Sequence, residues 1–570
     1  MPTRPPLPVA LAVAPALAIA VLAAPVGFGL IATVLPAFGW FPALGGETLS
    51  LAPWRELLAT PGLWRSAAIS LAAGLLTTAA ALAAVIAFVA GWSHTRAFRA
   101  IQHLISPLLS VPHAAAAFGI AFLIAPSGWL MRLVSPELTG FARPPDWLIV
   151  NDPWGLAMMA GLLVKELPFL FLVTLAALPQ VRSHLHVRTA ASLGYGRIAG
   201  FVLTAWPLTY PQIRLAVFAV IAYASSAVDV AIILGPTRPA PLAVRLVEWM
   251  NDPDLAMRFK ASAGALLQLG LTATAILLWV GGERIAAVLL RRLCRSGRRF
   301  RREGPARLAA AAVVTAAAAA VFAGLAVLAL WSFAGYWSFP DAVPRTLTLD
   351  IWRRELPGLT RPLAVTVGIG LAATALAVAI ALACLERESR TGERVRGRSP
   401  YILYLPLLVP QVSFVFGMQL AFLLAGIGAS ILAVVLAHLV FVLPYVLLSL
   451  SDPWHALDPR YARVAASLGA GAGLVFWRVR LPMLAAAILV GAAVGFAVSI
   501  GQYLPTLLIG AGRWPTVTTE AVALASGGDR RVIGVYAFVQ MLLPFLGFMI
   551  ATLVPAVAFM RRRDMRPAGA

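Results

Sequence analysis

The chain contains one stretch twice: RTAASLGYGRIAGFVLTAWP from Arg188 to Pro207, and RVAASLGAGAGLVFWRVRLP from Arg463 to Pro482. In both copies Ala-Ala-Ser-Leu-Gly is followed, thirteen residues after the glycine, by a proline. Gly194 and Gly469 are separated by 275 positions, as are the two prolines, which is about half of the 570 residues. A chain that repeats at half its length is expected to consist of two homologous halves.

The repeated stretch predicts a short helix, a glycine stop, a second short segment and then a proline that opens a membrane helix. Ala-Ala-Ser-Leu favours a helix, and the glycine ends it because glycine adopts a left-handed conformation without a side-chain penalty. Proline is suited to the first turn of the helix that follows. Long apolar runs flank both copies. We therefore expect a structured loop at a membrane face, with any short helical hairpin between spans as the alternative.

The composition is that of a polytopic membrane protein. Hydrophobic residues make up 61% of the chain and charged residues 12%, with a mean hydropathy of +0.87, whereas soluble domains carry about 25% charge. The net charge of +22 comes from residues that are almost all Arg. They lie in short loops between apolar runs, which is the pattern of cytoplasmic loops, so we expect no nucleic-acid partner.

Apolar segments of about 20 residues or more predict about twelve membrane spans, six in each half. The N-terminal run is longer than the apolar core of a signal peptide, so we interpret it as an uncleaved first span. A basic linker, 291–306, joins a first half, 1–290, to a second, 307–570. The predicted spans are 8–38, 64–92, 103–131, 155–179, 208–235, 261–290, 307–331, 361–385, 400–426, 430–450, 483–511 and 532–559.

Arg placement predicts the orientation. With both termini in the cytoplasm, the inside segments hold Arg96, the two repeated loops, the linker, the run 387–398 and Arg561-Arg562-Arg563. Six spans is an even number, so the second copy has the same orientation as the first and the repeat is parallel. Pro112 with Gly119 matches Pro410 with Gly417, and Ile233-Leu234-Gly235 matches Leu508-Ile509-Gly510.

The repeated stretch resembles the cytoplasmic coupling loop of ABC importer permeases, which has an E-A-A-x-x-x-G…L-P pattern. The matching positions are Arg188, Ala190, Gly194 and Pro207 in loop 182–207, and Arg463, Ala465, Gly469 and Pro482 in loop 455–482. Arg188 and Arg463 stand where the family usually has Glu, Thr189 and Val464 where Ala is usual, and Trp206 where Leu is usual.

The resemblance covers nearly the whole chain and is to fused two-half permeases of the type I, binding-protein-dependent importers, such as the iron(III) and thiamine types. It implies an all-α membrane fold of the bacterial inner membrane that carries no cofactor and is not itself an enzyme. It also implies two cytoplasmic ATPase subunits on the two loops and a periplasmic or extracellular solute-binding protein on the other side. The only two Lys do not follow a Gly, so a phosphate-binding Gly-Lys-Ser/Thr loop is absent.

No catalytic or metal-binding pattern is present. His184 and His186 flank the first loop, but their spacing alone does not predict a metal site, and Cys294 and Cys384 form no disulfide framework. Polar residues inside apolar spans are costly and tend to face a cavity or a partner helix. They could line a translocation path or serve as hydrogen-bond partners between helices. These residues are Lys165, Glu166, Asp229, Gln411 and Gln502.

Two other classes stay open at this stage. One is a secondary transporter driven by an ion gradient, with Lys165, Glu166 and Asp229 as a proton relay. The other is a membrane scaffold that transports nothing, which the duplicated loop and the polar residues within the spans argue against.

Overall fold

The computed structural model describes residues 7–392 and 399–558, which are helical through most of their length and contain no strand beyond two isolated bridges. Arg561, Arg562 and Arg563 and part of the run 387–398 lie outside the described residues. The helices of the first half are α1 (Val9–Ala37), α2 (Ala52–Leu58), α3 (Leu63–Trp92), α4 (Arg96–Ile105), α5 (His113–Ile124), α6 (Trp129–Val134), α7 (Leu156–Ala177), α8 (Ser183–Ser192), α9 (Arg197–Gly200), α10 (Trp206–Ser226), α11 (Asp229–Leu234), α12 (Leu242–Met250) and α13 (Met257–Ser296).

The second half repeats this order after a short connection, 297–303, which is narrower than the predicted linker because α13 runs on to Ser296. Its helices are α14 (Gly304–Phe333), α15 (Asp350–Thr391), α16 (Ser399–Leu408), α17 (Gln411–Leu424), α18 (Ile431–Ala456), α19 (Pro459–Ser467), α20 (Ala472–Val475), α21 (Leu481–Met483), α22 (Ala485–Ile500), α23 (Leu504–Gly510), α24 (Val517–Ala523) and α25 (Arg530–Ala558).

Within the described ranges, nine helices are long and apolar enough to cross a membrane, and two bent helix pairs raise the number to eleven if each is one span. The predicted count of twelve is therefore not confirmed. The predicted span 208–235 is not among them: α10 carries Arg214 and ends at Ser226, and the short α11 follows.

Three predicted spans are interrupted rather than continuous. Span 400–426 consists of α16 and α17, which meet at 104°. The break falls at Pro410, which lacks an N–H donor and disfavours a helical conformation in the residue before it. Span 103–131 is interrupted in the same way before Pro112. The third, 483–511, is interrupted between the end of α22 at Ile500 and the start of α23 at Leu504, and a bend of 73° lies at its start, between Met483 and Ala485.

The two halves exchange their first helices. Helix α1 packs on α17 of the second half, and α14 packs on α5 of the first. Each contact contains a glycine pair: a Cβ on Gly324 would lie 2.7 Å from the backbone of Gly119, and a Cβ on Gly417 would collide with the carbonyl of Gly29. Small residues allow such close approach in membranes, where packing rather than hydrophobicity drives association. Each of the two apolar cores therefore contains residues of both halves.

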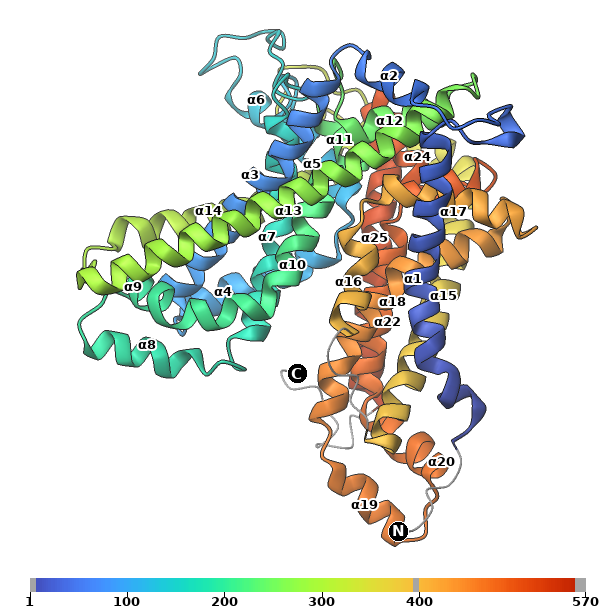
Figure 1. Cartoon of the computed structure of the whole chain (residues 1–570). Coiled ribbons are helices and arrows are strands. Elements are labelled where there is room, and N and C mark those ends of the chain that lie inside the picture. The colour runs from blue at the N-terminus through green and yellow to red at the C-terminus, as the bar shows by residue number, and fades with distance from the viewer. Residues whose placement is uncertain (1–6, 393–398, 559–570) are drawn as a thin grey trace.

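The two repeated loops lie on the same side of the molecule. Figure 1 shows α8 and α9 at the lower left and α19 and α20 at the lower right, whereas α2, α6 and α12 lie at the opposite end. Helix α1 begins, and α25 ends, on the side of the repeated loops. This arrangement follows from the parallel repeat.

Candidate functional site

The predicted helix, glycine stop and second segment are present in both loops. Helix α8 ends before Gly194 (φ +82°) and α19 ends before Gly469 (φ +83°). The N–H groups of Tyr195 and Ala470 each donate to the carbonyl five residues earlier, at 3.1 and 3.0 Å. These bonds and the left-handed glycines form a Schellman motif at the same position of each loop.

A short π-helix follows in each loop, at Phe201–Ala205 and Phe476–Arg480, again 275 positions apart. Single π turns inside helices are frequent at functional sites. Pro207 then lies in the first turn of α10 as predicted. Pro482 instead opens the three-residue α21, and the helix resumes at Ala485 after a break at Leu484.

The loop helices present exposed side chains to solvent. Arg188 and Arg463 are exposed, while Ala190 is buried and Ala465 half-buried, so the small residues face inward. On α19, Val464 is 59% exposed and Leu468, just after it, 82% exposed. Exposed apolar residues on one helix face mark an interaction surface. The matching residues of the first loop are Thr189 and Leu193, so its face is more polar.

The first loop is held by the connection between the halves. The N–H groups of Ile198 and Ala199 donate to the Glu303 carboxylate at 2.9 and 2.8 Å, which caps the start of α9. The N–H of Gly196 donates to the Arg299 carbonyl at 2.9 Å. The basic connection is thus part of the structure of the first loop, not merely a solvated spacer.

The second loop is held by a buried ion pair. Glu386, on α15, is 1% exposed and pairs with Arg390 at 2.6 Å and with Arg480. The Arg480 guanidinium also lies over the Trp454 ring, 5.9 Å from its centroid, and Arg390 donates to the carbonyl of Ala472 at 3.3 Å. A different carboxylate thus fixes each loop.

A polar cluster lies between the two halves. Glu166, on α7, is 5% exposed and lies 3.1 Å from His113 Nε2. Asp229, at the start of α11, is 6% exposed and accepts a hydrogen bond from the Tyr223 hydroxyl at 3.3 Å. The rings of His113 and Tyr223 join the two contacts, with centroids 4.7 Å apart.

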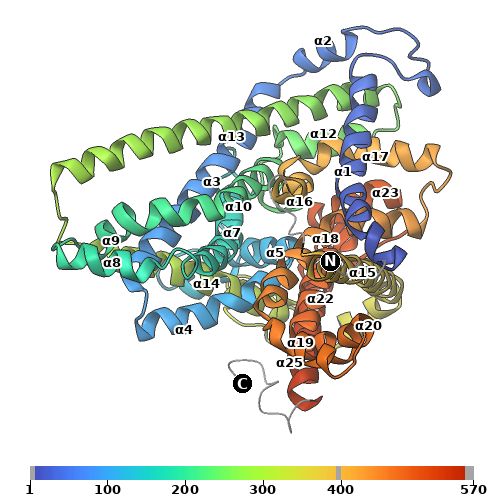
Figure 2. The same ribbon diagram turned by 60° about the horizontal axis from the view of Figure 1, so that its bottom comes forward.

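Tyrosines of the second half complete this cluster. Tyr445, on α18, lies within electrostatic range of Glu166 and of Tyr404 on α16. Tyr503, in the turn before α23, lies within range of Asp229. Helix α16 contacts both α10 and α18, and Figure 2 shows these helices near the middle of the molecule. We call Glu166, Asp229, His113, Tyr223, Tyr404, Tyr445 and Tyr503 the inter-half cluster.

In the part of the chain that the structure describes, the other predicted path residues do not bond with the two carboxylates. The Lys165 ammonium donates to the carbonyls of Leu108 and Leu109 at 2.9 and 3.2 Å. Gln411 begins α17 and is half-buried. Gln502 donates to the carbonyl of Val498 at 3.4 Å. Among the described residues none of the three bonds with Glu166 or Asp229.

Sequence reasoning missed the tyrosines. Two of them could have been noticed because they adjoin residues that the sequence had singled out: Tyr445 follows the repeated Pro444, and Tyr503 follows Gln502. Tyrosine is common at membrane interfaces, so its presence in a span does not by itself indicate a path.

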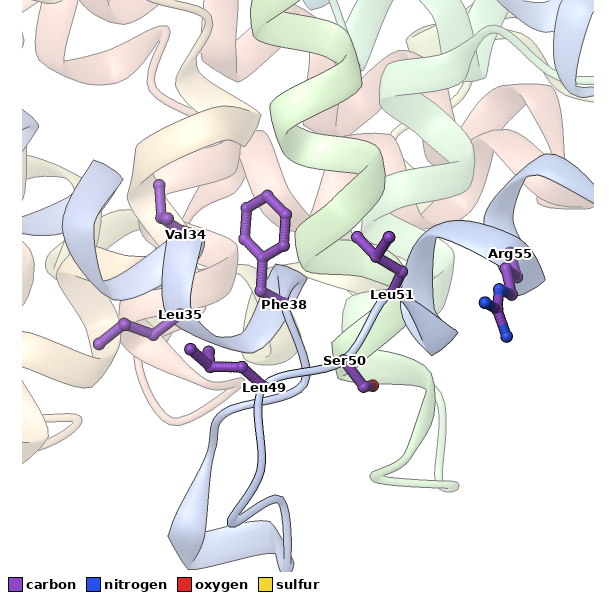
Figure 3. Close-up of a pocket in the computed structure, with 7 residues that line it drawn as sticks. All are labelled: Val34, Leu35, Phe38, Leu49, Ser50, Leu51 and Arg55. Carbon is purple, nitrogen blue, oxygen red and sulfur yellow. The ribbon is translucent and has the colours of Figure 1, made fainter.

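A surface pocket lies elsewhere. Its volume is about 510 Å³, and it lies at the end of α1 that is remote from the repeated loops. Figure 3 shows the apolar side chains of Val34, Leu35, Phe38, Leu49 and Leu51 around it, with Arg55 at its edge. It does not include a residue of the inter-half cluster.

This architecture is that of a helical membrane protein with two matching loops on one side and a polar cluster between two repeated halves. A sequence profile described as "Binding-protein-dependent transport system inner membrane component" matches residues 375–563. The "Inner membrane ABC transporter permease protein YnjC" of Escherichia coli K12 is 31% identical over 512 residues, which cover 89% of this chain and 91% of that protein. The chain therefore belongs to the permeases of binding-protein-dependent ABC importers.

Other relatives match shorter segments. The molybdenum transport system permease protein ModB of Mycobacterium tuberculosis is 36% identical over 136 residues, 21% of this chain and 50% of ModB. The spermidine/putrescine transport system permease protein PotC of Haemophilus influenzae is 21% identical over 163 residues, 28% of this chain and 63% of PotC. The chain is thus the transmembrane permease subunit of an ABC importer, a multi-pass inner-membrane protein that works with ATPase and solute-binding partners. Importers of this family are driven by ATP, so the alternative of a secondary transporter driven by an ion gradient is not retained.

Proposed function

We propose that loops 182–207 and 455–482 each bind one ATPase subunit at the cytoplasmic face. The observation that carries this proposal is the placement of two matching, glycine-capped helices on one side of the molecule, both with exposed outer faces (Figure 1). A rigid short helix seated in a partner's groove transmits a displacement that a flexible loop would absorb. Arg188, Gly194, Pro207, Arg463, Gly469 and Pro482 belong to these two docking elements, with Ala190 and Ala465 as their inward-facing small residues.

The orientation follows from the same proposal. With the docking loops inside, both termini are cytoplasmic, and the end that holds α2, α6 and α12 faces the periplasm or the cell exterior. A solute-binding protein would deliver its cargo to that end. When the two ATPase subunits close on ATP, they would draw α8 and α19 together. The two halves, 1–290 and 307–570, which the basic linker 291–306 joins, would then move relative to each other.

The solute would pass between the halves, along the inter-half cluster. Glu166 and Asp229 contribute from the first half, and Gln411 and Gln502 from the second. Lys165 would have a structural role, because its ammonium donates to two backbone carbonyls.

The test is Gly469→Asp in the complete permease expressed with its ATPase. Gly469 has a φ of +83° and open space where a Cβ would lie, so the aspartate strains the backbone by about 1–2 kcal/mol and adds charge to the docking face. We expect the variant to remain in the membrane and to lose most co-purifying ATPase and most uptake. Gly194→Asp should act in the same direction.

Gly426→Asp is the matched control. Gly426 has a φ of +74° and equally open surroundings, but it follows α17, at the opposite end from the docking loops. This control should retain the ATPase. Wild-type uptake and ATPase binding in both loop variants would contradict the docking role.

A further inference from the structure

The inter-half cluster contains a buried carboxylate, Asp229, that forms no ion pair within the described residues; His113 lies within electrostatic range of it but bonds with Glu166. Asp229 is 6% exposed, and among the described side chains only the Tyr223 hydroxyl bonds with it. Glu166, by contrast, has His113 at 3.1 Å. Burying a carboxylate without a cation partner is costly. We propose that the cluster is a binding site for a small organic cation, which supplies that partner; this rests on the proposed path between the halves.

The neighbouring lysine does not fill this role. The Lys165 ammonium is engaged by the carbonyls of Leu108 and Leu109 at the end of the turn before α5. It forms no ion pair with the adjacent Glu166 within the described part of the chain. Lys165 is therefore not the partner of Asp229.

The equivalent positions of the second half carry no acid. Asp229 lies six residues before Gly235, and the residue six before the equivalent Gly510 in the second half is Leu504. Glu166 lies two residues before Pro168, and the residue two before the equivalent Pro444 is Val442. Both apolar counterparts are buried in the equivalent helices, α23 and α18. The same scaffold thus packs well without the carboxylates, which argues for a role beyond packing.

Aromatic rings make the site suited to an organic cation. Tyr223 bonds with Asp229, and Tyr445 and Tyr503 of the second half lie within electrostatic range of Glu166 and Asp229. The faces of tyrosine rings attract ammonium groups. A metal ion is less well served: within the described residues no three His, Cys, Asp or Glu side chains gather as a metal site, whereas metals need several such ligands. An anion would meet two carboxylates and suffer like-charge repulsion.

The experiment measures ligand-dependent thermal stability of the full permease, purified with its ATPase in lipid nanodiscs. The probes are choline and its uncharged isostere 3,3-dimethyl-1-butanol, both over a millimolar range. We expect choline to raise the unfolding temperature of the wild type and the isostere to leave it unchanged. In Asp229→Asn the choline concentration for half of the shift should rise roughly tenfold or more, while Asp229→Glu should retain the response.

Asp254→Asn is the charge-matched control, since Asp254 is exposed in the loop before α13, and it should respond like the wild type. A choline response that is unchanged in Asp229→Asn, equal for the isostere, or absent from the wild type would overturn the cation site. Retention of the ATPase is scored in the same preparations. Loss of the ATPase from the docking-loop variants would support the proposed function, and its retention there would contradict it, independently of the choline response.

Discussion

Replacing Glu386 with Gln should release the second docking loop from the body of the permease. Glu386 is 1% exposed, and the side chains of its two arginine partners, Arg390 and Arg480, are each 18% exposed. The substitution preserves the shape but leaves two guanidinium groups without their anion. Removing one partner of a buried ion pair costs roughly 3–5 kcal/mol. We expect the free energy of unfolding to fall by that amount. The segment before Pro482, which Arg480 anchors, should be affected most.

The assay is a double-mutant cycle of Glu386→Gln and Arg480→Gln, read as the free energy of unfolding in mixed micelles. The coupling energy should be about 2–3 kcal/mol, the upper part of the range for residues in contact. Asp350→Asn is the control, because the pair of Asp350 with Arg353 is 76% and 78% exposed and exposed pairs contribute about 1 kcal/mol or less. A coupling energy within about 0.5 kcal/mol of zero would refute the anchoring role of Glu386.

Two further predictions concern the exchange of helices and the first loop. Gly324→Ala places a Cβ 2.7 Å from the Gly119 backbone and should destabilise the permease by about 1–3 kcal/mol. Its control, Gly368→Ala on α15, meets nothing within 4 Å; equal thermal stability of the two variants would contradict the close contact of α14 with α5. Glu303→Ala leaves the N–H groups of Ile198 and Ala199 without an acceptor, a cost of about 1–3 kcal/mol, so trypsin should cleave after Arg197 faster, as mass spectrometry of the fragments would show. Cleavage no faster than in Glu47→Ala, which removes an exposed carboxylate at the far end, would count against the capping role.

The features that sequence predicted well are local. The left-handed glycines at 194 and 469 and the helices before them follow from a few adjacent residues, and the repeat made each a check on the other. Long apolar runs likewise predicted both ends of α1, α3, α7, α14 and α25 within about three residues, whereas α13, α15 and α18 extend beyond their predicted ends.

The features that sequence missed depend on tertiary contacts. Hydropathy counts apolar residues and does not report a change of direction, so span 400–426 was predicted as continuous although Pro410 lies at its bend. Nothing local in Gly29 or Gly324 says that each faces a glycine of the other half. Ile198, the partner of Glu303, and Arg480, a partner of Glu386, lie about a hundred positions away in the chain. The tyrosines of the second half come near the carboxylates only when the halves are packed together.

Both repeated loops are proposed to bind ATPase subunits from the same side of the membrane. After Cys294 and Cys384 are replaced with Ser, single cysteines at Leu193 and at Leu468 should each cross-link to a co-expressed ATPase subunit in membranes, and both should resist a membrane-impermeant thiol reagent added from outside. Cross-linking at neither position, or labelling of either one from outside the cell, would contradict the account.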